Sequence, residues 1–197
     1  MTDTYLTGYH SCKPNNGYDY IIDNAPFLSG NGRNQWLSQG YYFWTDSDYW
    51  AKRWPSPTAQ KVITKFNISV PTKDDILDLV GNVNHQEHFV NLIGMIKKTA
   101  NTKNKRWTVN QIINYLRRDV PNDVFPYLGI KAEDNKKAVE NIPFIDPVFN
   151  SRLGKYTSPF IGLITRQQLC IFENARDRIC LVDVVFPDDF SAKFNSC

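Results

Sequence analysis

Residues 6–11 have the sequence Leu6-Thr7-Gly8-Tyr9-His10-Ser11, and residues 36–44 have the sequence Trp36-Leu37-Ser38-Gln39-Gly40-Tyr41-Tyr42-Phe43-Trp44. The first stretch predicts a strand that ends on a histidine followed by a small hydroxyl residue. The second predicts a glycine-bearing turn that enters a strand, because aromatic side chains favour strands. One imidazole, one hydroxyl and a flat aromatic face suit a planar, sugar-linked ligand such as a nicotinamide nucleotide.

Strands are expected at both ends of the chain. The first covers residues 5–10, and the β-branched, partly alternating run 61–70 predicts another. Residues 174–177 predict a hairpin loop between the last two strands. The strands near the C-terminus are expected at residues 159–165, 168–172 and 178–186.

Helical spacing dominates the middle of the chain. Apolar residues recur at three- and four-residue intervals between residues 74 and 98, in two helices separated at Gly81-Asn82. Thr108 is placed to cap a further helix that Pro121 ends. Residues 133–140 predict a short exposed helix.

Two short helices are expected in the first third. Asn15 and Asn16 are placed to cap one that runs to residue 22. The other covers residues 46–54, before two prolines. The whole pattern predicts a single α+β domain, residues 1–197, in which a helical insertion at about 73–141 separates the first strands from the last.

The composition is that of an ordinary folded protein with a mild positive charge. Apolar residues make up 42% of the 197 residues and charged residues 22%, so the chain can bury a core. The net charge of +3 is well short of a dedicated nucleic-acid binder, although it permits an anionic ligand or an RNA or DNA target. The most basic tract, residues 97–106, predicts a solvated loop between helices.

The four cysteines include no C-x-x-C pair, which excludes the common zinc and thioredoxin motifs. No apolar run approaches the roughly 20 residues that span a bilayer, and the first residues show no charged-then-apolar leader. We therefore expect a cytoplasmic protein with reduced thiols and no membrane partner. Cys170 and Cys180 are expected to pack as small apolar side chains in adjacent strands.

Three motifs follow one another along the chain: Tyr9-His10-Ser11, then Gly40-Tyr41-Tyr42-Phe43 with Ala51 in the helix behind it, and finally residues 166–171, Arg-Gln-Gln-Leu-Cys-Ile. The first resembles the Y-H-G-T/S strand end of the diphtheria-toxin-like, poly(ADP-ribose)-polymerase-like branch of ADP-ribosyltransferases. The second resembles that family's G-x-Y-F…A element. The third lies where the family has a late strand that normally begins with glutamate or, in divergent members, with another polar residue.

The resemblance implies a split, strongly bent β-sheet that binds NAD as co-substrate in the cleft between its halves. His10 would hold a ribose hydroxyl on the nicotinamide side. Ser11 and the backbone beside it, with Tyr9 in the same motif, would bind the nicotinamide amide. Tyr42 would stack on the nicotinamide ring. Gln168 would bond the ribose 2′-hydroxyl next to an oxocarbenium-like transition state.

Gln168 departs from the family pattern, which has glutamate there. An amide accepts a hydrogen bond from ribose, but it supplies no negative charge to a developing cation and is no general base. Because chain elongation in this family goes with the glutamate, the resemblance implies mono- rather than poly-ADP-ribosyl transfer. Glu173, expected further along the same strand, is an alternative acid, although strand alternation predicts that it faces the opposite side of the sheet from Gln168. Arg33 is placed either to contact the NAD pyrophosphate bidentately or to be an ordinary exposed arginine.

Two further clusters have weaker chemical interpretations. His85 and His88 form an H-x-x-H pair on one helix face, but no third ligand is evident, so no metal is expected. Cys12 stands close to the first-motif histidine as a candidate thiolate–imidazole pair, without the helix N-terminus or stable basic neighbour that such thiolates need. Strand alternation places Tyr42 and Trp44 on one face of the aromatic strand.

Three functions follow as hypotheses. The first is an NAD-dependent mono-ADP-ribosyltransferase, the toxin of a toxin–antitoxin or phage-defence system, which modifies RNA, DNA or protein and is held by a cognate antitoxin protein. A tRNA 2′-phosphotransferase-like enzyme is the second, although it relies on extra basic residues and histidines not seen here. The third is a catalytically degenerate module that binds a nucleotide or a partner, with Gln168 as its main support.

Overall fold

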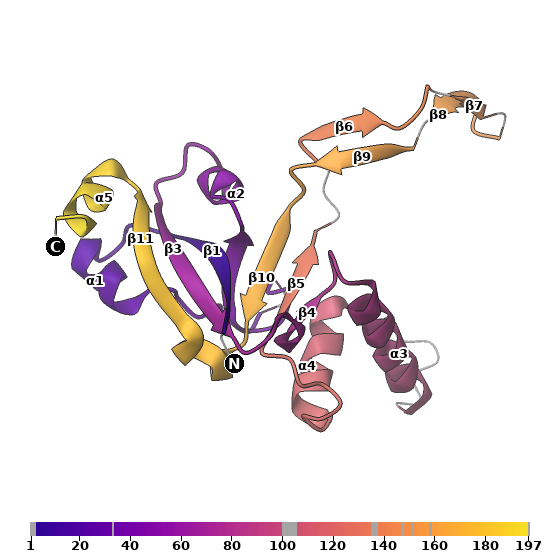
Figure 1. Ribbon diagram of the computed structural model, residues 1–197, viewed down its shortest axis with the longest axis horizontal. Helices are drawn as coiled ribbons and strands as arrows, with labels where there is room; N and C mark the ends of the chain where they lie inside the picture. Colours follow the sequence, from indigo (N-terminus) through magenta and orange to yellow (C-terminus); the bar gives the residue numbers. More distant parts are fainter. Residues whose placement is uncertain are drawn as a thin grey trace.

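The computed structural model describes residues 3–32, 34–99, 106–134, 138–146, 148–150, 152–157 and 159–196. At its centre is a seven-stranded mixed sheet in which only the pair at one edge, β4 and β5, is parallel (Figure 1). From edge to edge the strands are β11 (Ile179–Phe186), β3 (Val62–Val70), β1 (Thr4–Cys12), β2 (Tyr41–Thr45), β10 (Gln167–Ile171), β5 (Gly129–Glu133) and β4 (Ile76–Asp78).

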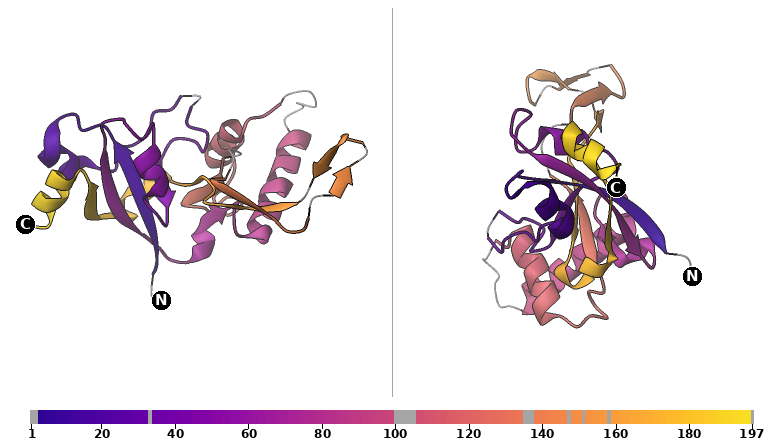
Figure 2. Two further views of the ribbon diagram at one scale, coloured as in Figure 1. Left: turned by 90° about the horizontal axis from the view of Figure 1, so that it is seen from above. Right: turned by 90° about the vertical axis from the view of Figure 1, so that its left-hand side faces the viewer.

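Helices gather at the two ends of this sheet. Figures 1 and 2 show α1 (Gly17–Asn24) and α5 (Asp188–Phe194) beside β11 and β3, and α3 (Val83–Thr99) and α4 (Val109–Asp119) beside β4 and β5. The short α2 (Tyr49–Arg53) follows β2. Helices and strands therefore form a mixed α+β fold, as the sequence predicts.

Most of the core lies in two large buried clusters on opposite faces of the sheet, beside a smaller third cluster around Trp44 and Ala51. Consecutive residues of β10 alternate between the two large clusters, because successive strand side chains point to opposite faces. One cluster packs under α3 and α4 and includes Leu77, Leu92, Ile113, Ile130 and Cys170. The other packs near α1 and includes Ile21, Phe43, Phe66, Ile171 and Val184.

Strands β1 and β2 are paired over a short length only. Nine residue pairs join β1 to β3, whereas two pairs, Gly8 with Thr45 and Tyr9 with Trp44, join β1 to β2. A Cβ atom on Gly8 would lie 2.8 Å from the Cβ of Phe43, so glycine allows the two strands to approach here. Beyond Tyr9 the strands diverge, which opens a space between the end of β1 and the start of β2.

The segment of chain that connects β5 to β10 forms an arm of two successive hairpins. Strand β6 (Glu140–Pro143) pairs with β9 (Phe160–Leu163), and β7 (Val148–Asn150) pairs with β8 (Lys155–Thr157). The arm projects away from the seven-stranded sheet in Figures 1 and 2. The chain then returns along β10 through the middle of the sheet.

Several predictions of secondary structure are confirmed. The strands expected at 5–10, 61–70 and 168–172 correspond to β1, β3 and β10, and those expected at 159–165 and 178–186 to β9 and β11. The helix after Thr108 begins with a reciprocal capping box between Thr108 and Gln111. Helix α1 is also found, but the expected cap is wrong: Asn16 at its start has a left-handed backbone at φ 70° and makes no side-chain capping hydrogen bond.

The helix expected from residue 74 is wrong in its first half. The chain instead makes a 3-10 turn, η1 (Lys73–Asp75), and then β4, which pairs in parallel with β5. Ile76 and Leu77 are buried there, and tertiary pairing overrides a spacing that also fits a helix. The insertion at about 73–141 therefore adds two strands to the central sheet besides its helices.

Other expectations fail for similar reasons. Residues 133–140 end β5 and begin β6 rather than forming a helix, with 135–137 outside the described residues. The turn η2 (Glu173–Arg178) is no hairpin loop, because β10 and β11 have three strands between them. Cys170 and Cys180 are therefore not in adjacent strands. Cys170 is buried as expected, whereas Cys180 is exposed. The expected basic loop falls largely on residues 100–105, also outside the described part.

Candidate functional site

A cavity of about 510 Å³ lies where β1 and β2 diverge, within the usual range of ligand pockets. Residues of all three motifs line it: His10 and Ser11 from β1, Tyr42 from β2 and Gln168 from β10. The remaining wall includes residues of the loop between α1 and β2, namely Phe27, Leu28, Ser29, Asn34, Gln35 and Trp36, and a polar and aromatic end with Trp44, Trp54, Asp134 and Arg166.

His10 fills the gap left by the interrupted β1–β2 pairing. Its Nδ1 donates to the carbonyl of Tyr42 over 3.0 Å, and its Nε2 accepts from the amide of Phe27 over 3.4 Å. These two partners define the tautomer, since a carbonyl only accepts and an amide N–H only donates. Burial lowers the pKa of His10, and the bond to the Tyr42 carbonyl offsets only part of that shift. The site therefore holds a neutral imidazole.

The ring of Tyr42 is held in the cavity wall by its own hydroxyl. That oxygen accepts from the amide of Leu37 over 2.9 Å and donates to the carbonyl of Ser38 over 2.8 Å. Burial is the main cause that raises the pKa of Tyr42, so the phenol stays protonated. A fixed aromatic face is a suitable platform for a planar ring.

Gln168 is fixed by a residue that the sequence did not single out for this role. The indole N–H of Trp36 donates to Gln168 Oε1 over 2.8 Å. Gln168 pairs in the sheet with Trp44 on one side and Ala132 on the other, so its backbone is in the centre of the sheet. No spacing in the sequence links Trp36 to a strand 132 residues away.

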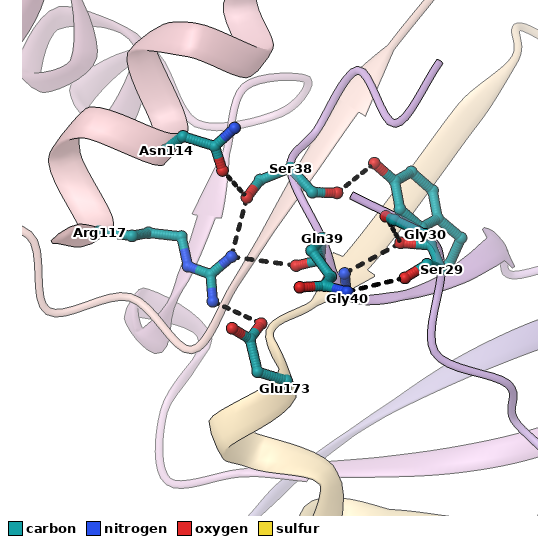
Figure 3. A network of polar contacts seen from close by, with 9 residues as sticks. Ser29, Gly30, Ser38, Gln39, Gly40, Asn114, Arg117 and Glu173 are labelled. Atoms are coloured by element: carbon teal, nitrogen blue, oxygen red, sulfur yellow. Dashed lines mark hydrogen bonds and ion pairs between the residues drawn. The ribbon is translucent and has the colours of Figure 1, made fainter. Parts of the chain in front are cut away.

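Helix α4 holds the loop that precedes the aromatic strand (Figure 3). Arg117 Nη1 donates to Ser38 Oγ over 2.8 Å and to the carbonyl of Gln39 over 3.0 Å, and its Nη2 donates to Glu173 over 2.5 Å. The Ser38 hydroxyl in turn donates to Asn114 Oδ1 over 2.6 Å. Because Ser38 has a left-handed backbone at φ 79°, this network stabilises a strained turn.

Glu173 is therefore not brought to the cavity. It lies beyond the end of β10, in η2, and pairs with Arg117. The expectation that it belongs to the same strand as Gln168 is wrong, because β10 ends at Ile171. Of the third-motif candidates, Gln168 is the one that lines the cavity.

The other predicted site residues have varied positions. Ser11 lines the cavity, and its hydroxyl donates to the carbonyl of Ala51 over 3.1 Å, which ties the end of β1 to α2. Tyr9 packs instead against the buried cluster that includes Trp44 and Ala51. Arg33 lies outside the described residues.

The far end of the cavity holds an arginine among three indoles. The Arg166 guanidinium lies 5.6, 5.4 and 5.5 Å from the ring centroids of Trp44, Trp50 and Trp54, within cation–π range. It also forms an ion pair of 2.9 Å with Asp134. The tryptophans alone are an ambiguous signal, because aromatic residues in this region also serve the core.

The weaker candidates have structural partners. His85 Nδ1 accepts from the amide of Asp78 over 3.0 Å, and His88 Nδ1 lies 2.7 Å from the hydroxyl of Tyr127. In the described ranges, no three histidine, cysteine or carboxylate side chains form a metal-binding group. Burial raises the pKa of Cys12 to about 11, which disfavours the thiolate–imidazole pair.

None of the helices in the described part of the chain has the length and apolarity to cross a bilayer. Comparison of the chain with protein-family models, with curated proteins and with solved structures finds no match.

Proposed function

We propose that this protein is an NAD-dependent mono-ADP-ribosyltransferase that modifies a macromolecule and acts as a toxin in a toxin–antitoxin or phage-defence system. One observation carries the proposal. His10 and Ser11, Tyr42, and Gln168 come from three segments that are far apart in sequence, and they line one cavity at the junction of three neighbouring strands. These are the residues to which the motif resemblance assigns the binding of NAD.

The narrow β1–β2 junction supports the split-sheet architecture that goes with this activity. Two residue pairs join the halves there, and His10 occupies the position where a third pair would follow. A ligand in the cavity would lie between the two halves of the sheet. A ribose hydroxyl would donate to Nε2 of the neutral His10 imidazole in place of the Phe27 amide, whose bond to that nitrogen is long at 3.4 Å.

The reaction breaks the glycosidic bond between the ribose C1′ and the nicotinamide nitrogen. Nicotinamide leaves with the electron pair of that bond, a nucleophile of the acceptor forms the new bond to C1′, and the acceptor's proton passes to solvent. Tyr42 would support the nicotinamide ring, and Ser11 lies beside it in the same cavity. Gln168 would bond the ribose without supplying a charge, which predicts a slower reaction than a carboxylate gives.

Nucleotide binding without chemistry is the second candidate. Gln168 favours it, because its Oε1 already accepts from Trp36 and an amide is no base. Release of nicotinamide separates the two functions, since only the enzyme shows it.

The test is nicotinamide release from labelled NAD by the purified protein, alone and with RNA, single-stranded DNA or cell protein extract. We expect release by the wild type and at least a tenfold loss in His10→Ala and Tyr42→Ala, on the order of one strong interaction. Tyr5→Ala is the control, because Tyr5 is 67% exposed. Wild-type rates in both site variants, with folding intact, would exclude the proposal. Binding of NAD without release would favour the binding module.

A further inference from the structure

Trp54 stands at the rim where two cavities meet. The catalytic cavity and a second cavity of about 350 Å³ share Ser11, Cys12 and Trp54 in their linings. The Trp54 side chain is 45% exposed, although its ring packs 5.9 Å from that of Trp44. A large aromatic surface left half open at the mouth of a site is available to stack on a flat group.

The second cavity carries positive charge. Lys13 and Lys61 line it, and none of its described lining residues is acidic. The amine of Lys61 is anchored, since it donates to the carbonyls of Lys52 and Ser56 over 2.7 and 2.6 Å. Lys13 is exposed. The Lys61 side chain is itself buried, so Lys13 is the cation that is open to a phosphate backbone, and none of the described lining residues is a carboxylate that would compete for it.

In the cavity that contains His10 and Tyr42, Arg166 and Asp134 provide polar groups near Trp54. The Arg166 side chain is 11% exposed and lies next to the Trp54 ring, where the ion pair with Asp134 holds it. Its buried Nε has no hydrogen-bond partner among the described residues. Guanidinium donors beside carboxylate oxygens match the mixed donors and acceptors on the edge of a nucleobase.

We propose that Trp54, with Arg166 and Asp134, forms the acceptor subsite for an unpaired base of single-stranded nucleic acid, whose backbone continues into the groove of Lys13 and Lys61. An aromatic platform beside a basic groove is how proteins bind single strands. A duplex would not fit this arrangement, because its bases are stacked on one another and not on the protein. The proposal rests on the proposed function, since the acceptor would receive the ADP-ribosyl group in the cavity that Trp54, Arg166 and Asp134 themselves line.

The decisive measurement has two independent readouts on the whole protein. The first is binding of fluorescent single-stranded RNA, single-stranded DNA and duplex DNA oligonucleotides of mixed sequence, measured by anisotropy without NAD. The second is transfer of label from NAD to the same oligonucleotides and to cell protein extract. RNA and DNA arms identify the sugar, while the extract tests a protein acceptor.

We expect single strands to bind and duplex to bind at least tenfold more weakly. Trp54→Ala should weaken single-strand binding and label transfer about tenfold, the scale of one base–aromatic stack, and Trp54→Phe should restore most of both. Lys13→Ala should lower affinity and reduce the salt dependence, as loss of about one phosphate contact does. Tyr5→Ala, an exposed aromatic outside both linings, is the matched control.

Equal binding by the wild type and Trp54→Ala would overturn the subsite, as would label that appears only on protein. The proposed function fails separately, through absence of nicotinamide release by the wild type. Oligonucleotide binding needs no NAD, so it tests the subsite even then.

Discussion

The indole N–H of Trp36 donates to Gln168 Oε1 over 2.8 Å. This bond joins the loop before β2 to the central strand β10, and it fixes which atom of the Gln168 amide is the acceptor. The Gln168 side chain is thus oriented by a partner that lies 132 residues earlier in the sequence.

Gln168→Glu should increase nicotinamide release. The carboxylate would still accept from Trp36, now in a stronger charge-assisted bond, and it would supply the negative charge that favours a developing cation. We expect at least a tenfold rise in turnover at saturating NAD, and a fall for Gln168→Ala. A well-folded Gln168→Glu protein with less activity than the wild type would show that the amide itself is required.

Trp36→Phe should lower turnover while the protein remains folded. Phenylalanine keeps an aromatic ring in the loop but removes the donor, and a net hydrogen bond of about 1 kcal/mol corresponds to a loss of about fivefold. Steady-state nicotinamide release and near-ultraviolet circular dichroism check the two parts of the prediction. Unchanged kinetics would mean that the bond does not orient Gln168 in the reaction.

Arg117→Ala should destabilise the protein far more than Glu173→Gln. Arg117 is largely buried and donates to Ser38 and Gln39 as well as to Glu173, so its removal leaves several polar groups without a partner. We expect a loss of about 2–4 kcal/mol in the free energy of unfolding in urea. Glu173 is half exposed, and its loss should cost less than about 1 kcal/mol. Similar losses in both variants would contradict a central role for the Ser38 turn.

Gly40→Ala should be destabilising, and Gly94→Ala should not. A Cβ on Gly40 would lie 2.5 Å from the carbonyl oxygen of Ile171 and 2.6 Å from Cys170 Sγ, so β2 and β10 would have to separate. The expected cost is about 1–3 kcal/mol. A Cβ on Gly94 in α3 meets no described atom within 4 Å, and alanine there should stabilise the helix by up to about 1 kcal/mol. Urea unfolding of the two variants side by side checks both signs.

Acidification should lower the free energy of unfolding of the wild type toward that of the His10→Gln variant. Burial lowers the pKa of His10 in the folded state from its ordinary 6.5. As the pH falls through about 6.5, the unfolded chain therefore binds a proton that the folded chain does not, and the wild type loses stability. Glutamine has no such proton to bind. Urea unfolding at pH 7.5 and 5.5 measures the gap, and a constant or wider gap at pH 5.5 would contradict a buried neutral His10.

Local patterns predicted most of the strands and the placement of the first two motifs. The alternation in residues 61–70 and the aromatic run that ends at Trp44 are typical of strands, and both patterns can be recognised from residues adjacent in sequence. The capping box at Thr108 is likewise contained within four residues. These features needed no knowledge of distant partners.

The contacts that define the site depend on distant partners and were missed for that reason. Whether Ile76 and Leu77 form a strand or a helix depends on pairing with β5, more than 50 residues further along. The bond between Arg117 and Ser38 spans 79 residues. Trp54, Asp134 and Arg166 were not identified because no motif relates an indole, an acid and an arginine that only the folded sheet brings together.

The position of β10 has a consequence for the chain during its synthesis. Strand β10 pairs with β2 on one side and β5 on the other, and it carries Gln168. The strands made first, β1 to β3, can pair with one another as soon as they leave the ribosome, but β2 and β5 have no common neighbour until β10 follows. A nascent chain that stops within the arm therefore has two unjoined pieces of sheet and no complete cavity. The proposed toxin would be harmless to the cell that makes it until more than four fifths of the chain, through Ile171 of 197 residues, has been synthesised.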